Sequence, residues 1–242
     1  MSLDAIQQKK QVIESRSRIR EFVFGIQDGL ISTVGLLAGI QGATENRIVV
    51  IVTGLTAMFS GAISMATGSY LSSGAQKDIF DKEIADAEKL AESEPYLAAE
   101  GLLKALGEEG LSKEQSYRMV KVLLLERNVF LRTFQEKVFG LGSAEINQPF
   151  RAALVMGLSF LVGAIIPILP YMAMAGAMAL YLSVFLSALT LFVVGAFKGH
   201  LAGQSLFVSG GKFFIIAVSA AGMGYLIGLV VQWFFPGISI PA

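Results

Sequence analysis

The stretch FVFGIQDGLISTVGLLAGI, residues 22–40, decides the fold class, because it is apolar along almost its whole length and yet contains the carboxylate of Asp28. A membrane-spanning helix needs about 20 mostly apolar residues at a rise of about 1.5 Å per residue. A charged side chain at bilayer depth costs ~2.5–3.5 kcal/mol on insertion scales, so such residues usually face a cavity, a partner or an ion. The stretch therefore predicts a spanning helix that carries a functional carboxylate.

The composition of the whole chain extends this prediction beyond one helix. Of 242 residues, 54% are hydrophobic and only 16% are charged, and the mean hydropathy is positive, which excludes an ordinary water-soluble domain. The long apolar windows are continuous rather than alternating, which favours helices over barrel strands. We therefore predict an all-α polytopic membrane protein with five transmembrane helices. The five windows are Glu21–Gly42, Ile48–Ser72, Ala152–Tyr171, Met174–Phe197 and Gly211–Phe234.

A charged segment separates the second window from the third. Its helical periodicity predicts a first helix that ends before Pro95, a short second helix, and a third helix from Ser112 to Gly140 that opens with a capping box of Ser112 and Gln115. We expect three parts: residues 1–74 with helices 1 and 2, residues 75–150 as a cytoplasmic three-helix domain, and residues 151–242 with helices 3 to 5.

The distribution of lysine and arginine predicts the orientation, since cytoplasmic loops carry the positive excess. Five basic residues precede the first window, ten lie in the charged segment, and Arg47 alone is expected on the other side. We expect a cytoplasmic N-terminus, an external C-terminus, and a bacterial inner membrane as the location. The chain has no cysteine, and no catalytic triad, zinc motif or nucleotide-binding pattern, so we expect neither an enzyme nor a cofactor, and no nucleic-acid partner.

Polar residues follow one face of the first window. Glu21 lies seven residues before Asp28 and Ser32 lies four residues after it, which places all three near the same face of a helix. This face predicts a polar ladder that leads inward from the cytoplasmic end. Alternatively, Asp28 lies shallow, about 10 Å below the start of the helix, and is only solvated or caps the helix.

The second window contributes a stripe of small and hydroxyl-bearing residues, Thr56, Ser60, Ser64 and Gly68, at steps of four. Met58 and Met65 lie on a neighbouring face. A thioether is a soft ligand that suits Fe(II) better than Mg(II), although methionines in an apolar helix also serve as packing residues.

Five motifs in sequence order carry a family resemblance. GIQDGLISTVGLLAGI and GAISMATGSYL are similar to the first and second helices of the vacuolar iron transporter family, in which a DGL followed by Ser or Thr and a GAISM segment recur. GAIIPILPY resembles the paired-proline third helix of this family. VGAFKGHLAGQS resembles its link from the fourth to the fifth helix, and AAGMGYLIGLVV resembles its last helix.

This resemblance implies a homodimer in the lipid bilayer that moves Fe(II), and often Mn(II), out of the cytosol in exchange for protons. The implied pathway runs between the first two helices of both subunits. The family's aspartate falls on Asp28 and its methionine on Met65, while Glu21 takes the place of an acidic residue nearer the cytosol. We add Ser32, Met58 and Ser64 as further candidates along the pathway.

Two departures from the family pattern leave another function open. Some members place a second acidic residue where this chain has Ala57, and the metal ligands near the end of the third cytoplasmic helix are replaced here by Phe134, Gln135 and Val138. The chain is alternatively a degenerate member that acts as a membrane scaffold or metal-responsive interaction protein, or a transporter of another substrate. The acidic residues that could still bind metal in the cytoplasmic domain, or merely form a solvated surface, are Glu88, Glu92, Glu100 and Glu136.

Overall fold

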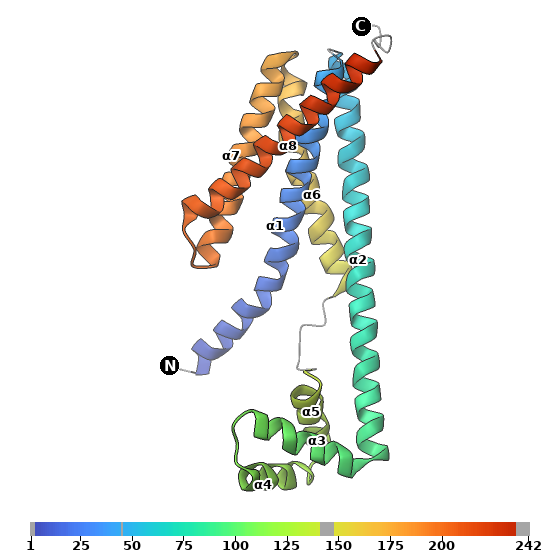
Figure 1. Cartoon of the computed structure of the whole chain (residues 1–242), viewed down its shortest axis with the longest axis vertical. Helices are drawn as coiled ribbons and strands as arrows, with labels where there is room; N and C mark the ends of the chain where they lie inside the picture. The colour runs from blue at the N-terminus through green and yellow to red at the C-terminus, as the bar shows by residue number, and fades with distance from the viewer. Residues whose placement is uncertain (1–2, 45, 141–147, 236–242) are drawn as a thin grey trace. The chain divides into compact units, whose positions relative to one another are not determined.

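The computed structural model describes residues 3–44, 46–140 and 148–235, and within these ranges the chain forms eight α-helices and no strand (Figure 1). The all-α prediction is confirmed. The helices are α1 (Leu3–Ala43), α2 (Arg47–Ser93), α3 (Pro95–Glu108), α4 (Lys113–Leu123), α5 (Arg127–Val138), α6 (Pro149–Ala173), α7 (Ala177–Leu201) and α8 (Leu206–Phe234).

Five of these helices are long and apolar enough to cross a membrane, as predicted. Four of the candidate spans are Ile19–Ala43, Pro149–Ala173, Ala177–Leu201 and Leu206–Phe234, and the fifth lies within α2. Packing divides the chain into two compact units, one of Met1–Tyr70 with Pro149–Ala242 and one of Leu71–Gln148, and α2 continues from the first unit into the second.

The helices of the second unit differ from the prediction in two places. The expected first helix of this unit is not separate, because the segment between the second apolar window and Ser93 contains no proline and α2 runs through it without a break. The expected third helix is divided into α4 and α5 at residues 124–126. The break brings Val120 of α4 and Phe130 and Phe134 of α5 into one core, and no glycine or proline marks it in the sequence.

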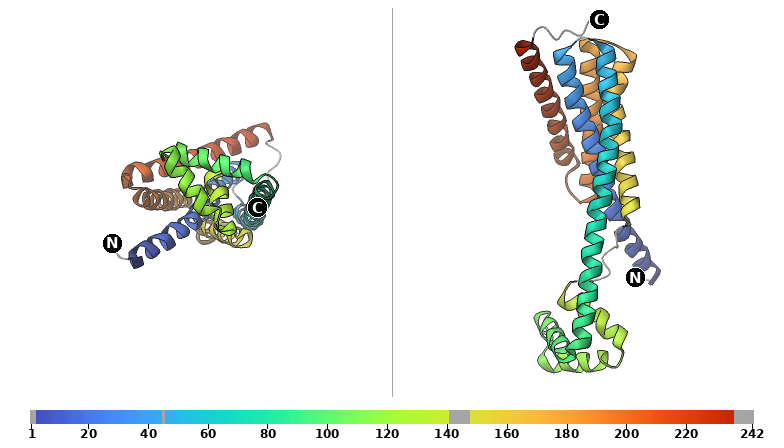
Figure 2. Two further views of the ribbon diagram at one scale, coloured as in Figure 1. Left: turned by 90° about the horizontal axis from the view of Figure 1, so that it is seen from below. Right: turned by 90° about the vertical axis from the view of Figure 1, so that its right-hand side faces the viewer.

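In the first unit, α1 lies against both α6 and α8 (Figures 1 and 2). Glycines allow these helix backbones to approach closely. A Cβ atom at Gly25 of α1 would lie 2.7 Å from the carbonyl oxygen of Met156 in α6, and a Cβ at Gly39 would lie 3.0 Å from the carbonyl oxygen of Gly224 in α8. Small residues therefore make α1 the helix around which this unit packs.

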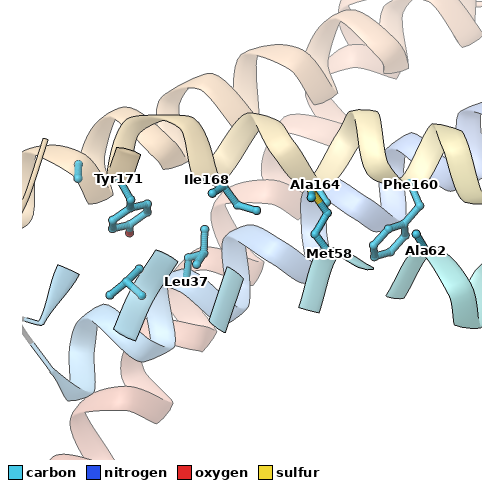
Figure 3. Packing of buried hydrophobic residues seen from close by; sticks show 9 residues of the cluster. Leu37, Met58, Ala62, Phe160, Ala164, Ile168 and Tyr171 are labelled. Atoms are coloured by element: carbon cyan, nitrogen blue, oxygen red, sulfur yellow. The ribbon is translucent and has the colours of Figure 1, made fainter. Parts of the chain in front are cut away.

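A hydrophobic cluster joins α2 and α6 to α1. Met58 and Ala62 of α2 face Phe160, Ala164 and Ile168 of α6, as the close view shows (Figure 3). All of these side chains are buried. The cluster positions the middle of α2 next to α1 and α6.

Hydrogen bonds support α6 where its two prolines, Pro167 and Pro170, weaken the backbone ladder. The Ser183 hydroxyl of α7 donates to the carbonyl oxygen of Pro167 at 2.8 Å. At the end of α6, Arg47 Nε donates to the carbonyl oxygen of Tyr171 at 2.7 Å, and the Arg47 guanidinium also donates to that of Met172. The start of α2 thereby satisfies carbonyls that the end of α6 leaves without an intrahelical donor.

The second unit has its own hydrophobic core. Buried Leu102 and Leu106 of α3 pack with Phe130 and Phe134 of α5, and the two phenylalanine rings stack with centroids 6.0 Å apart. Lys137 Nζ donates to Glu109 at 2.7 Å, which raises the pKa of Lys137 above its usual range. These contacts allow the unit to pack around its own core.

The capping box at the start of α4 is confirmed. The Ser112 hydroxyl accepts from the Gln115 backbone amide at 3.3 Å, and the Gln115 side chain accepts from the Ser112 amide at 2.9 Å.

We expect Ser112→Ala to lower the stability of the second unit by about 1 kcal/mol, because a backbone donor loses its acceptor. Hydrogen exchange of the α4 amides measures this loss. Ser112→Asp retains an acceptor and serves as the control, and equal exchange in the Ala variant and the wild type would contradict the prediction.

Candidate functional site

A pocket of about 240 Å³ opens between α1 and α2, and we call it the Asp28 pocket. It combines polar and apolar side chains from both helices with the ring of Phe160 from α6. Its lining consists of Asp28, Ser32, Thr33 and Leu36 of α1, Ala57, Gly61, Ser64 and Met65 of α2, and Phe160 of α6.

Helical periodicity places these residues on facing sides of the two helices. Asp28 and Ser32 are separated by one turn of α1, and Gly61 and Met65 by one turn of α2. A side chain at Gly61 would collide with the ring of Phe160, so the glycine leaves room for this ring beside the pocket. The buried Phe160 side chain belongs both to the hydrophobic cluster and to the lining of the pocket.

The pocket offers oxygen and sulfur ligands next to a carboxylate without a cation. Asp28 is partly buried, and none of the ion pairs among the described residues involves it. The Ser32 hydroxyl donates to the backbone carbonyl oxygen of Asp28 at 2.5 Å, not to its carboxylate. The carboxylate of Asp28 and the thioether of Met65 thus line one small space, and a divalent cation of intermediate softness suits this combination.

The structure does not bring two of the predicted pathway residues to this pocket. Glu21 is 6% exposed and its carboxylate lies 3.5 Å from Arg20 Nη2. It lies two helical turns before Asp28, whereas the pocket extends along α1 in the opposite direction, from Asp28 to Leu36. Met58 is 6% exposed and packs in the core beside Ala164, so its sulfur does not reach the pocket (Figure 3).

The acidic residues of the second unit do not form a metal site in the part of the chain that the structure describes, where no three His, Cys, Asp or Glu side chains gather in a suitable group. Glu92 pairs with Arg127. The side chains of Glu88, Glu100 and Glu136 are exposed to solvent. These placements favour the interpretation of a solvated surface over that of a ligand cluster.

Phe134, Gln135 and Val138, at the positions where the resemblance implied metal ligands, have structural contacts instead. Phe134 is buried and contacts Phe139 edge-on, with ring centroids 5.2 Å apart. Val138 packs against the same core, and the Gln135 side chain donates to the carbonyl oxygen of Ile84 at 3.3 Å.

Sequence reasoning missed four of the lining residues, Thr33, Leu36, Gly61 and Phe160. Gly61 had a usable signal, because it lies one turn before Met65 on the same face. No sequence signal pointed to Phe160, since this residue follows the second unit in the chain and reaches the pocket only through packing of α6 against α2.

Five helices long and apolar enough to cross a membrane, three of which line a pocket that contains a carboxylate, define a multi-pass membrane protein. Residues 19–229 match the VIT family, and the chain belongs to this family. It is 26% identical to "Vacuolar iron transporter 1" of Arabidopsis thaliana over 88% of this chain and 86% of the relative. It is also 27% identical to "Vacuolar iron transporter" of Plasmodium falciparum (isolate 3D7), over 90% of this chain and 83% of the relative.

A third relative, "Vacuolar iron transporter 2" of Oryza sativa subsp. japonica, is 27% identical over 88% of this chain and 87% of the relative. The similarity in all three covers both apolar halves of the chain and the charged segment between them. The family resemblance stated from the five motifs is therefore confirmed.

Proposed function

We propose that the chain transports Fe(II), and also Mn(II), across its membrane through the Asp28 pocket. The observation that carries this proposal is the shared lining of Asp28 and Met65, a carboxylate without a counter-cation beside a thioether. Three similar proteins named as vacuolar iron transporters support iron as the substrate.

Protons are the proposed counter-ion. When the metal leaves, the Asp28 carboxylate is free to bind a proton, so that metal and proton compete for the same oxygen atoms. This competition couples outward metal movement to inward proton movement. The proposed direction of metal movement, out of the cytosol, follows from the resemblance to the family.

A second copy of the chain completes the proposed site. One carboxylate, one thioether and a few hydroxyls are a sparse ligand set for a divalent metal. Thr56, Ser60 and Ser64 of α2 are exposed in a single chain, so a partner that covers this face would add ligands and exclude lipid. The proposed pathway therefore runs between α1 and α2 of two subunits.

Uptake of Fe(II) and Mn(II) into proteoliposomes under an imposed pH gradient tests the function. We expect uptake that stops when the gradient is collapsed with a proton carrier. Protein-free liposomes control for leakage, and metal uptake that ignores the gradient would contradict proton coupling but not transport.

A membrane scaffold or metal-responsive interaction protein is the second candidate. Its support is that Ala57, at the position where some members have an acidic residue, lines the Asp28 pocket and leaves it with one carboxylate among its lining residues. Wild-type protein that binds Fe(II) but moves neither metal in the liposome assay would favour this candidate.

The thioether of Met65 should determine preference among metals. We expect Met65→Leu, which keeps the apolar volume but removes the sulfur, to lower Fe(II) uptake about 10-fold and Mn(II) uptake less, because Mn(II) favours oxygen ligands. Competition between the two metals in the uptake assay measures the change. Met178→Leu on α7 makes the same exchange at an exposed position outside the pocket. An equal loss for both metals in Met65→Leu would argue against a ligand role.

A further inference from the structure

A second pocket, of about 370 Å³, lies between α1 and α7 at the ends of their membrane spans. We call it the Arg20–Lys198 groove. It does not share a lining residue with the Asp28 pocket. Its lining consists of Ile19, Arg20, Val23, Phe24 and Gln27 of α1, Lys198 and Leu201 of α7, and Ala202.

The wall of the groove is apolar. Phe24 and Leu201 remain 51% and 41% exposed although the surrounding helices are packed, so the groove presents apolar surface from two different helices. Ile19 begins one candidate span and Leu201 ends another, which places this surface where a span meets the edge of the bilayer. An acyl chain fits such a wall without loss of hydrogen bonds.

Two cations from the two helices lie at the same groove. Lys198 Nζ is 5.3 Å from the ring centroid of Phe213 on α8, which holds the amine near the groove, and no ion pair of the described residues involves Lys198. The Arg20 side chain is 81% exposed and has one acidic neighbour, Glu21, at 3.5 Å. Among the side chains that the structure describes, these two cations lie with one carboxylate, which gives the groove a net positive charge.

We propose that this groove binds an anionic phospholipid. The headgroup phosphate pairs with Arg20 and Lys198, for which the forked guanidinium and the ammonium are both suitable donors. One acyl chain lies along Val23, Phe24 and Leu201. Basic pockets between transmembrane helices are suited to this class of lipid, and an acidic peptide would not fill the apolar wall.

The groove and the Asp28 pocket meet the same helix at adjacent residues. Gln27 of α1 lines the groove and Asp28 lines the pocket. The bound lipid therefore stabilises the position of α1 at the level of the carboxylate. The lipid site does not depend on the identity of the transported metal.

Native mass spectrometry of the purified full chain, with equal amounts of phosphatidylglycerol and phosphatidylcholine in the detergent, tests this proposal. We expect the wild type to retain phosphatidylglycerol in preference to phosphatidylcholine. A surface cation contributes about 5-fold in affinity for an anionic lipid, so Arg20→Gln and Lys198→Gln should each lower the preference about 5-fold and the double variant by about 25-fold.

Lys212→Gln is the matched control, because it removes an exposed cation of α8 that does not line the groove. Its lipid preference should equal that of the wild type. An equal loss in Lys212→Gln, or an unchanged preference in the double variant, would overturn the proposal. Each single variant repeats the test if the double variant does not fold.

Two further experiments test whether binding requires the acyl chain as well as the headgroup phosphate. Ala202→Trp fills the groove and keeps both cations, and we expect it to lose bound phosphatidylglycerol. Inorganic phosphate at millimolar concentration should not displace the lipid. Retention of the lipid in Ala202→Trp, or its displacement by inorganic phosphate, would refute an acyl-chain site in the groove.

Discussion

Asp28→Asn is expected to reduce Fe(II) uptake into proteoliposomes about 100-fold, to near the level of protein-free liposomes. The carboxylate of Asp28 is the charged group of its pocket, and an amide of the same shape neither neutralises a divalent cation nor accepts a proton. The Ser32 hydrogen bond is made to the backbone carbonyl of residue 28, so it survives the substitution.

The same substitution should not unfold the protein. An isolated charge at bilayer depth costs ~2.5–3.5 kcal/mol, so the neutral amide is at least as well accommodated there. Thermal unfolding in detergent is therefore expected to show an equal or higher Tm for Asp28→Asn. This combination of lost uptake and retained stability separates a role in transport from a role in folding.

Asp78→Asn is the matched control, since it makes the same chemical change at an exposed carboxylate of the second unit. We expect its uptake to equal that of the wild type. Full uptake in Asp28→Asn would show that metal passes elsewhere. A comparable loss in Asp78→Asn would show that the assay responds to charge in general.

Gly224→Ala is expected to have the largest effect on stability. A Cβ atom at this position of α8 would lie 2.8 Å from the carbonyl carbon of Gly35 in α1, closer than real Cβ contacts come, and 3.1 Å from the Cα atom of the same residue. The groups that it meets are backbone, so the helices must separate. Overpacking of this kind costs ~1–3 kcal/mol or more, against a gain of about 1 kcal/mol from the higher helix propensity of alanine.

Gly222→Ala provides a control two residues away on the same helix. A Cβ atom at Gly222 would meet no atom within 4 Å, so the substitution adds only the higher helix propensity of alanine. The variant should therefore be as stable as the wild type or slightly more stable. We expect the Tm of Gly224→Ala in detergent to fall by ~5 °C relative to Gly222→Ala. Equal melting of the two variants would disprove the close contact between α1 and α8.

The separation of α1 from α8 should also affect transport. Gly35 lies on the same helix as Asp28 and Ser32, so displacement of α1 alters the Asp28 pocket. Fe(II) uptake by Gly224→Ala is therefore expected to fall even at temperatures where the variant remains folded. Uptake equal to that of the wild type at such temperatures would mean that the pocket does not depend on this contact.

Local sequence patterns were sufficient for the features that depend on near neighbours in the chain. The five apolar windows predicted the spans because the cost of unpaired backbone groups in lipid requires a helix in every such window. The capping box of Ser112 and Gln115 was also predictable, since both of its hydrogen bonds join residues three apart. Asp28 was recognisable as unusual from its apolar surroundings.

Features that depend on distant contacts were not predictable from these patterns. The break between α4 and α5 has no glycine or proline signal, and it follows from the packing of Phe130 and Phe134 with Val120. Glu21 shares a helical face with Asp28 in the sequence, but the pocket extends from Asp28 toward Leu36, away from Glu21, which lies buried beside Arg20.

Met58 and Met65 show most clearly the difference between what a local sequence pattern predicts and what distant contacts decide. Their spacing places them near one another on α2, and periodicity alone offers no reason to choose between them as ligands, although the family resemblance implied Met65. Packing against Ala164 and Phe160 buries Met58 in the core, whereas Met65 lines the pocket with Asp28. The periodicity of a helix determines which residues share a face, but only the neighbouring helices determine which of them meets lipid, core or cavity.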